Sequence, residues 1–94
     1  MDIKLDETPG RGSLYMGKFD HKVAELQWKI HENYIEADST EVDDSIKGQG
    51  YGRKLFEELI RHARDRKLKI KPVCPFVVMM FKRHPEDHDV LYKD

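Results

Sequence analysis

The alternation of hydrophobic and polar residues predicts three strands in the first half of the chain. Residues 24–30 give the clearest signal, because apolar and polar side chains alternate with the two-residue period of a strand covered on one face. A shorter strand is expected over residues 13–18, and another over residues 34–42, where Ile35 and Ala37 share a face. Short connections join the three segments, which therefore predict an antiparallel meander.

A helical period replaces this alternation after residue 45. Over residues 50–66, apolar side chains recur three and four positions apart and form one stripe: Tyr51, Leu55, Phe56, Leu59, Ile60 and Ala63. Residues 69–73 alternate again as a fourth strand, and Pro75 is expected to begin a second helix that ends near residue 83. The order of three strands, helix, strand and helix predicts an α+β fold with helices packed against the sheet.

The first residues show little apolar periodicity. Residues 1–12 are therefore expected to form a flexible N-terminal tail, and residues 13–94 a single domain. A chain of 94 residues has room for one core and no second domain.

The charge balance and the cysteine content exclude several classes of function. The chain has 17 basic and 18 acidic residues, so its net charge of -1 generates no long-range attraction to nucleic acid or anionic lipid. Cys74 is the single cysteine, which excludes an intramolecular disulfide and a multi-cysteine metal site. No apolar run approaches the roughly 20 residues of a membrane span. We therefore expect a cytoplasmic protein without nucleic-acid or membrane partners.

A glycine-rich loop precedes the first predicted helix. It consists of Lys47, Gly48, Gln49, Gly50, Tyr51 and Gly52, followed by Arg53. Free amides in the first helical turn and the helix dipole favour an anion at this position, and glycine allows a phosphate to approach the backbone. The spacing excludes the dinucleotide fingerprint and the nucleotide P-loop, because the required later glycine and the Gly-Lys-Ser/Thr ending are absent. The alternatives are a plain glycine-rich turn or a phosphate-binding interaction domain.

The loop resembles motif A of the GNAT N-acetyltransferases, Q/R-x-x-G-x-G/A, with Lys47, Gly50 and Gly52 at the defined positions. The wider sequence around residues 40–52, 72–77 and 84–86 is similar to the compact single-domain predicted acetyltransferases of that superfamily. The resemblance implies acetyl-CoA as donor and an amine as acceptor. It also implies that Thr40, Glu41 and Val42 present backbone groups to the pantetheine arm, and that the amides of residues 49–52 face the diphosphate. The residues indicate no metal site.

The sequence departs from the family pattern at several positions. Lys47 replaces the usual glutamine or arginine, and Ser39 stands where compact relatives often have histidine. Typical members place a tyrosine on the last helix as general acid, whereas the corresponding residue here is Met80 or Phe81.

Three side chains are candidates for the chemistry. Glu36 lies eleven residues before Lys47, the spacing at which histone-type relatives carry their base, and Glu41 adjoins the expected thioester. Cys74 precedes a helix N-terminus, which favours a thiolate and makes it a possible nucleophile. The alternatives are solvent-facing strand charges for the glutamates and a buried apolar residue for Cys74.

Other polar clusters point to chemistry less strongly. His84 and His88 are expected to lie at a helix stop on the surface, and the basic run over residues 61–71 is expected to be a solvated helix face. Trp28 and Phe56 fit core positions better than ligand-stacking positions.

The leading hypothesis is an acetyl-CoA-dependent N-acyltransferase that transfers the acetyl group directly to an amine. The rival is a non-catalytic CoA-binding or sensing module. Both a monomer and a homodimer are compatible with the sequence.

Overall fold

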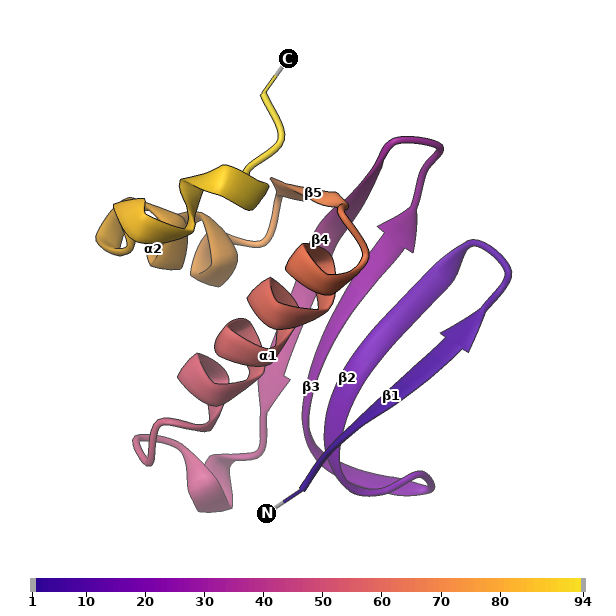
Figure 1. The fold of residues 1–94 in the computed structure, drawn as a ribbon. Helices are drawn as coiled ribbons and strands as arrows, with labels where there is room; N and C mark the ends of the chain where they lie inside the picture. Colours follow the sequence, from indigo (N-terminus) through magenta and orange to yellow (C-terminus); the bar gives the residue numbers. More distant parts are fainter. Residues whose placement is uncertain (1, 94) are drawn as a thin grey trace.

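The computed structural model describes residues 2–93 as a five-stranded mixed sheet with its helices on one face (Figure 1). The strands lie in chain order across the sheet: β1 (Ile3–Thr8), β2 (Arg11–Lys18), β3 (His21–Ile30), β4 (Tyr34–Val42) and β5 (Lys69–Pro72). The helices are α1 (Tyr51–Asp65), α2 (Pro75–Arg83) and the 3-10 segments η1 (Asp44–Ile46) and η2 (Pro85–Val90). Met1 of the predicted tail and Asp94 of the predicted domain lie outside the described residues.

The structure confirms the predicted α+β fold and most element positions. β4 and α2 have the predicted bounds, and α1 begins and ends within one residue of the predicted helix. Strands β2, β3 and β4 form the expected antiparallel meander, and β5 joins it in parallel with β4. Residues 85–90, for which no element was expected, form η2.

The prediction of a tail over residues 1–12 is wrong, because Ile3–Thr8 forms the edge strand β1. This strand pairs antiparallel with β2 from Ile3 opposite Met16 to Thr8 opposite Arg11. Glu7 also contacts Arg66, at the end of α1, with 2.7 Å between oxygen and nitrogen. An edge strand needs few apolar side chains, since only one neighbour and part of one helix cover it.

The core lies between the sheet and α1. The predicted helical stripe is buried from Leu55 to Ala63, and Trp28 of β3 is fully buried beneath it. Phe56 meets Phe81 of α2 edge to face, with ring centroids 5.2 Å apart, which joins the two helices. Trp28 and Phe56 are therefore core residues, as predicted. Among residues 2–93, none of the helices has the length and apolar character that a membrane span requires.

A β-bulge in β4 changes which side chains face the helices. Trp28 pairs with Ala37 and Gln27 pairs with Ser39, so Asp38 is the extra residue. Beyond the bulge, Thr40 lies opposite the buried Leu26 and thus shares the helix-side face of the sheet. Strict alternation from Ile35 and Ala37 would have placed Ser39 and Glu41 on that face instead.

The structure predicts a pH dependence of stability that involves His62 of α1. Its ring lies 5.2 Å from the Trp28 ring, and burial, assisted by the charge of Arg66, lowers the pKa of His62 below 6.5. The unfolded chain therefore binds a proton at a higher pH than the folded chain does. The stability contributed by neutral His62 is present above pH 6.5 and is lost as pH falls towards the folded-state pKa.

We expect urea unfolding between pH 7.5 and 5.5 to show a smaller loss of stability for His62→Gln than for the unchanged protein. The comparison between the two proteins removes contributions from the other histidines. Equal pH slopes for the two proteins would contradict the assignment.

Candidate functional site

The parallel pairing of β4 and β5 stops halfway along β4. It runs from Tyr34 opposite Lys69 to Ala37 opposite Pro72. The amides of Val73 and Cys74 then both donate to the carbonyl of Ala37, at 3.0 Å each, and the chain leaves the sheet to begin α2 at Pro75. Within residues 2–93, no strand pairs with this edge of β4 beyond Ala37, so the backbone of its second half is open there.

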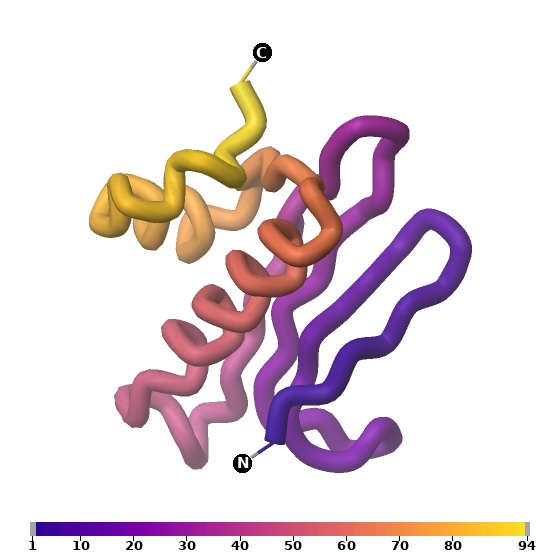
Figure 2. The backbone as a smooth tube through the Cα atoms, in the orientation of Figure 1, coloured from indigo at the N-terminus to yellow at the C-terminus, as the bar shows by residue number. Residues whose placement is uncertain are grey.

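The loop after β4 turns the chain into the start of α1 (Figure 2). Gly48 and Gly50 have φ values of +81° and +82°, the left-handed region that glycine enters without strain. Gly50 is the N-cap of α1 and provides no side-chain hydrogen bond, and the first turn carries no acidic residue. The leading amides of a fifteen-residue helix are thus left for another acceptor.

Gly52 has a different role, which concerns packing. A Cβ atom at this position would approach the ring of Phe76 to 3.0 Å, closer than most side chains tolerate. The glycine therefore allows the first turn of α1 to lie close to the first turn of α2.

Hydrogen bonds fix the approach to the loop. Asp43 caps η1, and its carboxylate accepts from the amide and the hydroxyl of Ser45 at 2.9 and 2.7 Å, which lowers the pKa of Asp43. Lys47 forms a 2.8 Å pair with Asp44, which raises the pKa of the lysine. Lys47 is exposed and remains charged at neutral pH, so it adds positive potential beside the amides of α1.

A cleft of about 500 Å³ lies between the end of β4, this loop and α2. All of the predicted cofactor-binding residues except Gln49 line it: Thr40, Val42, Lys47, Gly48, Gly50, Tyr51, Gly52 and Arg53. The structure therefore gathers these positions around one space, with amides at one end and strand backbone along one side.

The opposite wall of the cleft comes from α2, whose lining residues were not predicted from the sequence. The lining side chains are Phe76, Met79, Met80 and Arg83, followed by His84. Their three- and four-residue spacing on one helix face is the signal that could have identified them. Met80 and Phe81 are both buried, but only Met80 lines the cleft. Its thioether cannot donate a proton there.

Cys74 lies immediately behind this wall. It is the N-cap of α2, only 6% exposed, and its thiol donates to the hydroxyl of Thr40 at 3.5 Å. Thr40 lines the cleft, which places the sulfur one side chain away from the space.

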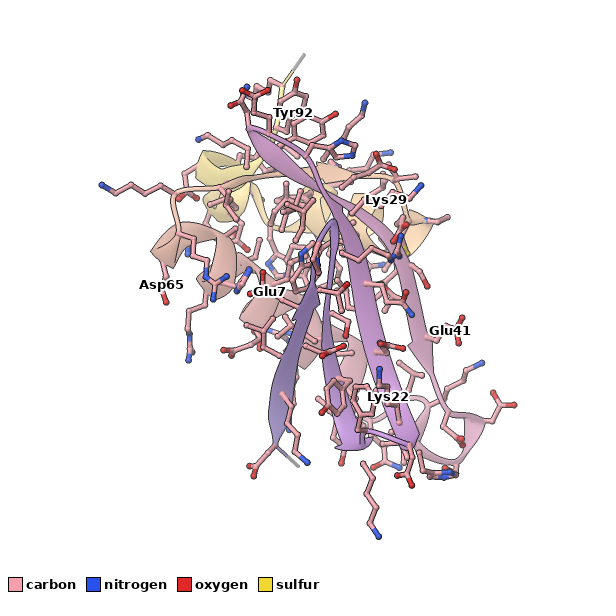
Figure 3. All side chains as sticks on the ribbon, turned by 90° about the vertical axis from the view of Figure 1, so that its right-hand side faces the viewer. Glu7, Lys22, Lys29, Glu41, Asp65 and Tyr92 are labelled. Atoms are coloured by element: carbon pink, nitrogen blue, oxygen red, sulfur yellow. The ribbon has the colours of Figure 1, made fainter. Side chains whose placement is uncertain are left out.

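Both candidate carboxylates lie on the sheet face that carries no helix, because Glu36 alternates with the buried Ile35 and Ala37. Figure 3 labels Glu41 on this face. Glu41 is exposed and lies opposite Glu25, because the bulge turned its side chain away from the helix side. Glu36 precedes the residue at which β4 and β5 separate, and its carboxylate contacts the ring of His31 at 3.0 Å. The structure thus does not bring the two glutamates together with Cys74, but it places Glu36 beside the opening in the sheet.

His84, Glu86 and Asp87 have possible metal-ligand atoms within 4.8 Å of one another. The guanidinium of Arg64 already contacts Asp87 at 3.2 Å, and Glu86 is hydrogen-bonded to His84 at 3.0 Å. His88 does not join this group, and its Nε2 lies 2.7 Å from the carbonyl of Phe81.

The sequence model of one family, described as GCN5-related N-acetyl-transferase, matches residues 13–90. A search of the curated proteins found no matching relative. Among solved structures, the chain is 29% identical to a GCN5-like protein from Staphylococcus aureus, with a TM-score of 0.74. That alignment covers 97% of this chain and 89% of the other.

Two more distant structures share the fold. Tetrahymena GCN5 is 15% identical with a TM-score of 0.65, and the alignment covers 93% of this chain and 63% of that one. Ribosomal-protein-alanine N-acetyltransferase from Brucella melitensis is also 15% identical, with a TM-score of 0.62 and coverage of 94% and 68%, respectively.

Proposed function

The chain belongs to the GCN5-related N-acetyltransferase family, and on that premise we propose that it transfers an acetyl group from acetyl-CoA directly to an amine. The observation that carries this proposal is the cleft itself. It joins an open strand edge to the uncapped N-terminus of α1. An extended arm that ends in a diphosphate matches both features.

The donor is proposed to lie with its diphosphate on the amides of Gln49, Gly50, Tyr51 and Gly52. Lys47 and Arg53 line the same space and neutralise part of its charge. The pantetheine arm runs along β4 past Val42, bonding to the open strand edge as another strand would. Its thioester then lies near Thr40, and a β4 amide near Glu41 polarises the carbonyl.

The acceptor is proposed to approach from the sheet face that carries no helix, since core side chains fill the helix side. Its nitrogen attacks the thioester carbonyl, a carbon–nitrogen bond forms, and the carbon–sulfur bond breaks to release the CoA thiolate. An amine is protonated at neutral pH and must first lose a proton. Glu36 is the proposed acceptor of that proton, directly or through water, because it stands beside the opening between β4 and β5.

Two alternatives remain from the sequence. In a covalent route, Cys74 takes the acetyl group before the amine does, and its hydrogen bond to Thr40 keeps its sulfur near the cleft. In a non-catalytic CoA-binding module, the acetyl group is never transferred. Met80 favours this second alternative, because a thioether cannot protonate the leaving thiolate.

Calorimetric titration with CoA, acetyl-CoA and inorganic phosphate tests the binding part of the proposal. We expect both CoA forms to bind with micromolar affinity, and phosphate at the same concentration not to compete, because it cannot reach the amides and the strand edge together. Competition by phosphate as strong as that by CoA would instead support a phosphate-binding interaction domain. No heat from CoA at millimolar concentration would refute the proposal.

Turnover is tested separately, with acetyl-CoA and a panel of small amines and lysine peptides. We expect CoA thiol release that depends on the amine. Binding without amine-dependent thiol release would favour the non-catalytic module. We also propose that the chain forms a single domain that includes β1. The proposed location of the protein is the cytoplasm.

A further inference from the structure

The cleft carries more positive charge than the diphosphate position uses. Arg83 and His84, at the end of α2, line the wall opposite the glycine loop, and Arg53, which is already proposed to face the diphosphate, lines the cleft from the first turn of α1. The guanidinium of Arg53 forms an ion pair with the carboxylate of Glu57 at 3.4 Å, and both side chains are exposed. Arg83 is exposed and forms no ion pair within residues 2–93, so its guanidinium is available to an anion.

Arg83 lies at the end of the cleft away from the proposed position of the thioester. Cys74 and Thr40 mark one end of α2, and nine helical residues at 1.5 Å each place Arg83 roughly 13 Å further along. The helix C-terminus carries partial negative charge, so an anion there is attracted by side chains and not by the backbone.

The balance of charges changes at the edge of the cleft. A neighbouring cavity of about 530 Å³ shares Arg53 and His84 with the cleft. Its other lining residues include both signs of charge, with two further guanidinium groups beside four carboxylates: Arg61, Arg64, Glu57, Asp65, Glu86 and Asp87. This cavity therefore has no excess of positive charge, and the guanidinium that forms no ion pair among the described residues lies on the cleft side, at Arg83.

Acyl-CoA carries a further negatively charged group, because its ribose bears a 3′-phosphate beyond the diphosphate. We propose that Arg83, assisted by Arg53, forms a subsite for the 3′-phosphate of the donor, so that the protein selects CoA thioesters over donors that lack this phosphate. The inference rests on the proposed function, since it requires the diphosphate to lie on the α1 amides. Arginine suits the role because its planar guanidinium can donate two hydrogen bonds to one phosphate.

The test compares CoA with 3′-dephospho-CoA by calorimetry on the unchanged protein, on Arg83→Gln and on Arg61→Gln. Arg61 is the matched control, because its substitution removes the same charge from α1, while its side chain contacts Glu58 and does not line the cleft. We expect the unchanged protein and Arg61→Gln to bind CoA about tenfold more tightly than 3′-dephospho-CoA. In Arg83→Gln the preference for CoA over 3′-dephospho-CoA should fall below about threefold. Binding of CoA should weaken, while binding of 3′-dephospho-CoA should stay unchanged.

The outcomes separate the subsite from the proposed function. If the unchanged protein binds neither ligand, the proposed function fails. If it binds both equally, or if Arg83→Gln weakens both by the same factor, CoA binding stands and the 3′-phosphate subsite is refuted. Thermal unfolding of each variant checks that the exposed substitutions leave the fold intact.

Discussion

Gly50→Asp is expected to weaken CoA binding about 30-fold, equivalent to about 2 kcal/mol, whereas Gly50→Asn should stay within about threefold of the unchanged protein. Gly50 is the N-cap of α1 and has a φ of +82°. The diphosphate is proposed to lie on its amide. A carboxylate at that position occupies the anion site and repels a second anion. Calorimetry with CoA measures both affinities.

The pair of variants separates charge from shape. Asparagine and aspartate have almost the same size, and both tolerate the left-handed conformation better than other side chains do. Beyond the adjacent backbone, a Cβ atom built on Gly50 meets nothing within 4 Å, and any strain from the positive φ is common to the two variants. Equal affinities of the two variants for CoA would show that the diphosphate does not lie at this helix end.

Elements with strong periodicity could be predicted from the sequence because one layer of packing determines them. The apolar stripe of α1 is buried against the sheet, and the alternation in β3 matches a strand with one covered face. Pro75 begins α2, since its fixed φ suits the first helical turn and the residue before it is extended.

The edge strand β1 was missed because its pairing does not depend on apolar side chains. Its residues are mostly polar, and Pro9 and Gly10 read as the end of a tail instead of the turn between two strands. Backbone pairing with β2 holds the segment, and an ion pair between Glu7 and Arg66 fixes it to α1. Neither contact produces a local pattern in the sequence.

The candidate site was predictable on one side only. Glycines and basic residues at a strand–helix junction indicate a phosphate loop from local chemistry alone. The α2 wall depends on how two helices pack, which Gly52 permits by its close approach to Phe76. The side-chain direction of Glu41 depends on the bulge at Asp38, and a bulge adds a residue without any necessary sequence mark.

Glu36→Gln is expected to lower kcat about 100-fold while the affinity for acetyl-CoA changes little, because general bases typically contribute two to four orders of magnitude. The amide keeps the size of the side chain and an oxygen that can accept from the His31 ring, but it lacks the negative charge and cannot take a proton. Glu32→Gln is the matched control, since Glu32 is exposed in the loop between β3 and β4, and its activity should stay unchanged. Thiol release at saturating acetyl-CoA and amine measures the effect.

Cys74→Ala, measured in the same assay, distinguishes direct from covalent transfer. Under direct transfer its activity should fall by less than about tenfold, the cost of altered packing next to Thr40. Under covalent transfer no acetyl group can leave the donor, and mass spectrometry of the unchanged protein with acetyl-CoA should show acetylated Cys74. Loss of activity in Cys74→Ala together with an active Glu36→Gln would refute the proposed base. Because the thiol is buried behind Thr40 while Glu36 stands at the opening of the sheet, we expect the carboxylate variant to be the more impaired of the two.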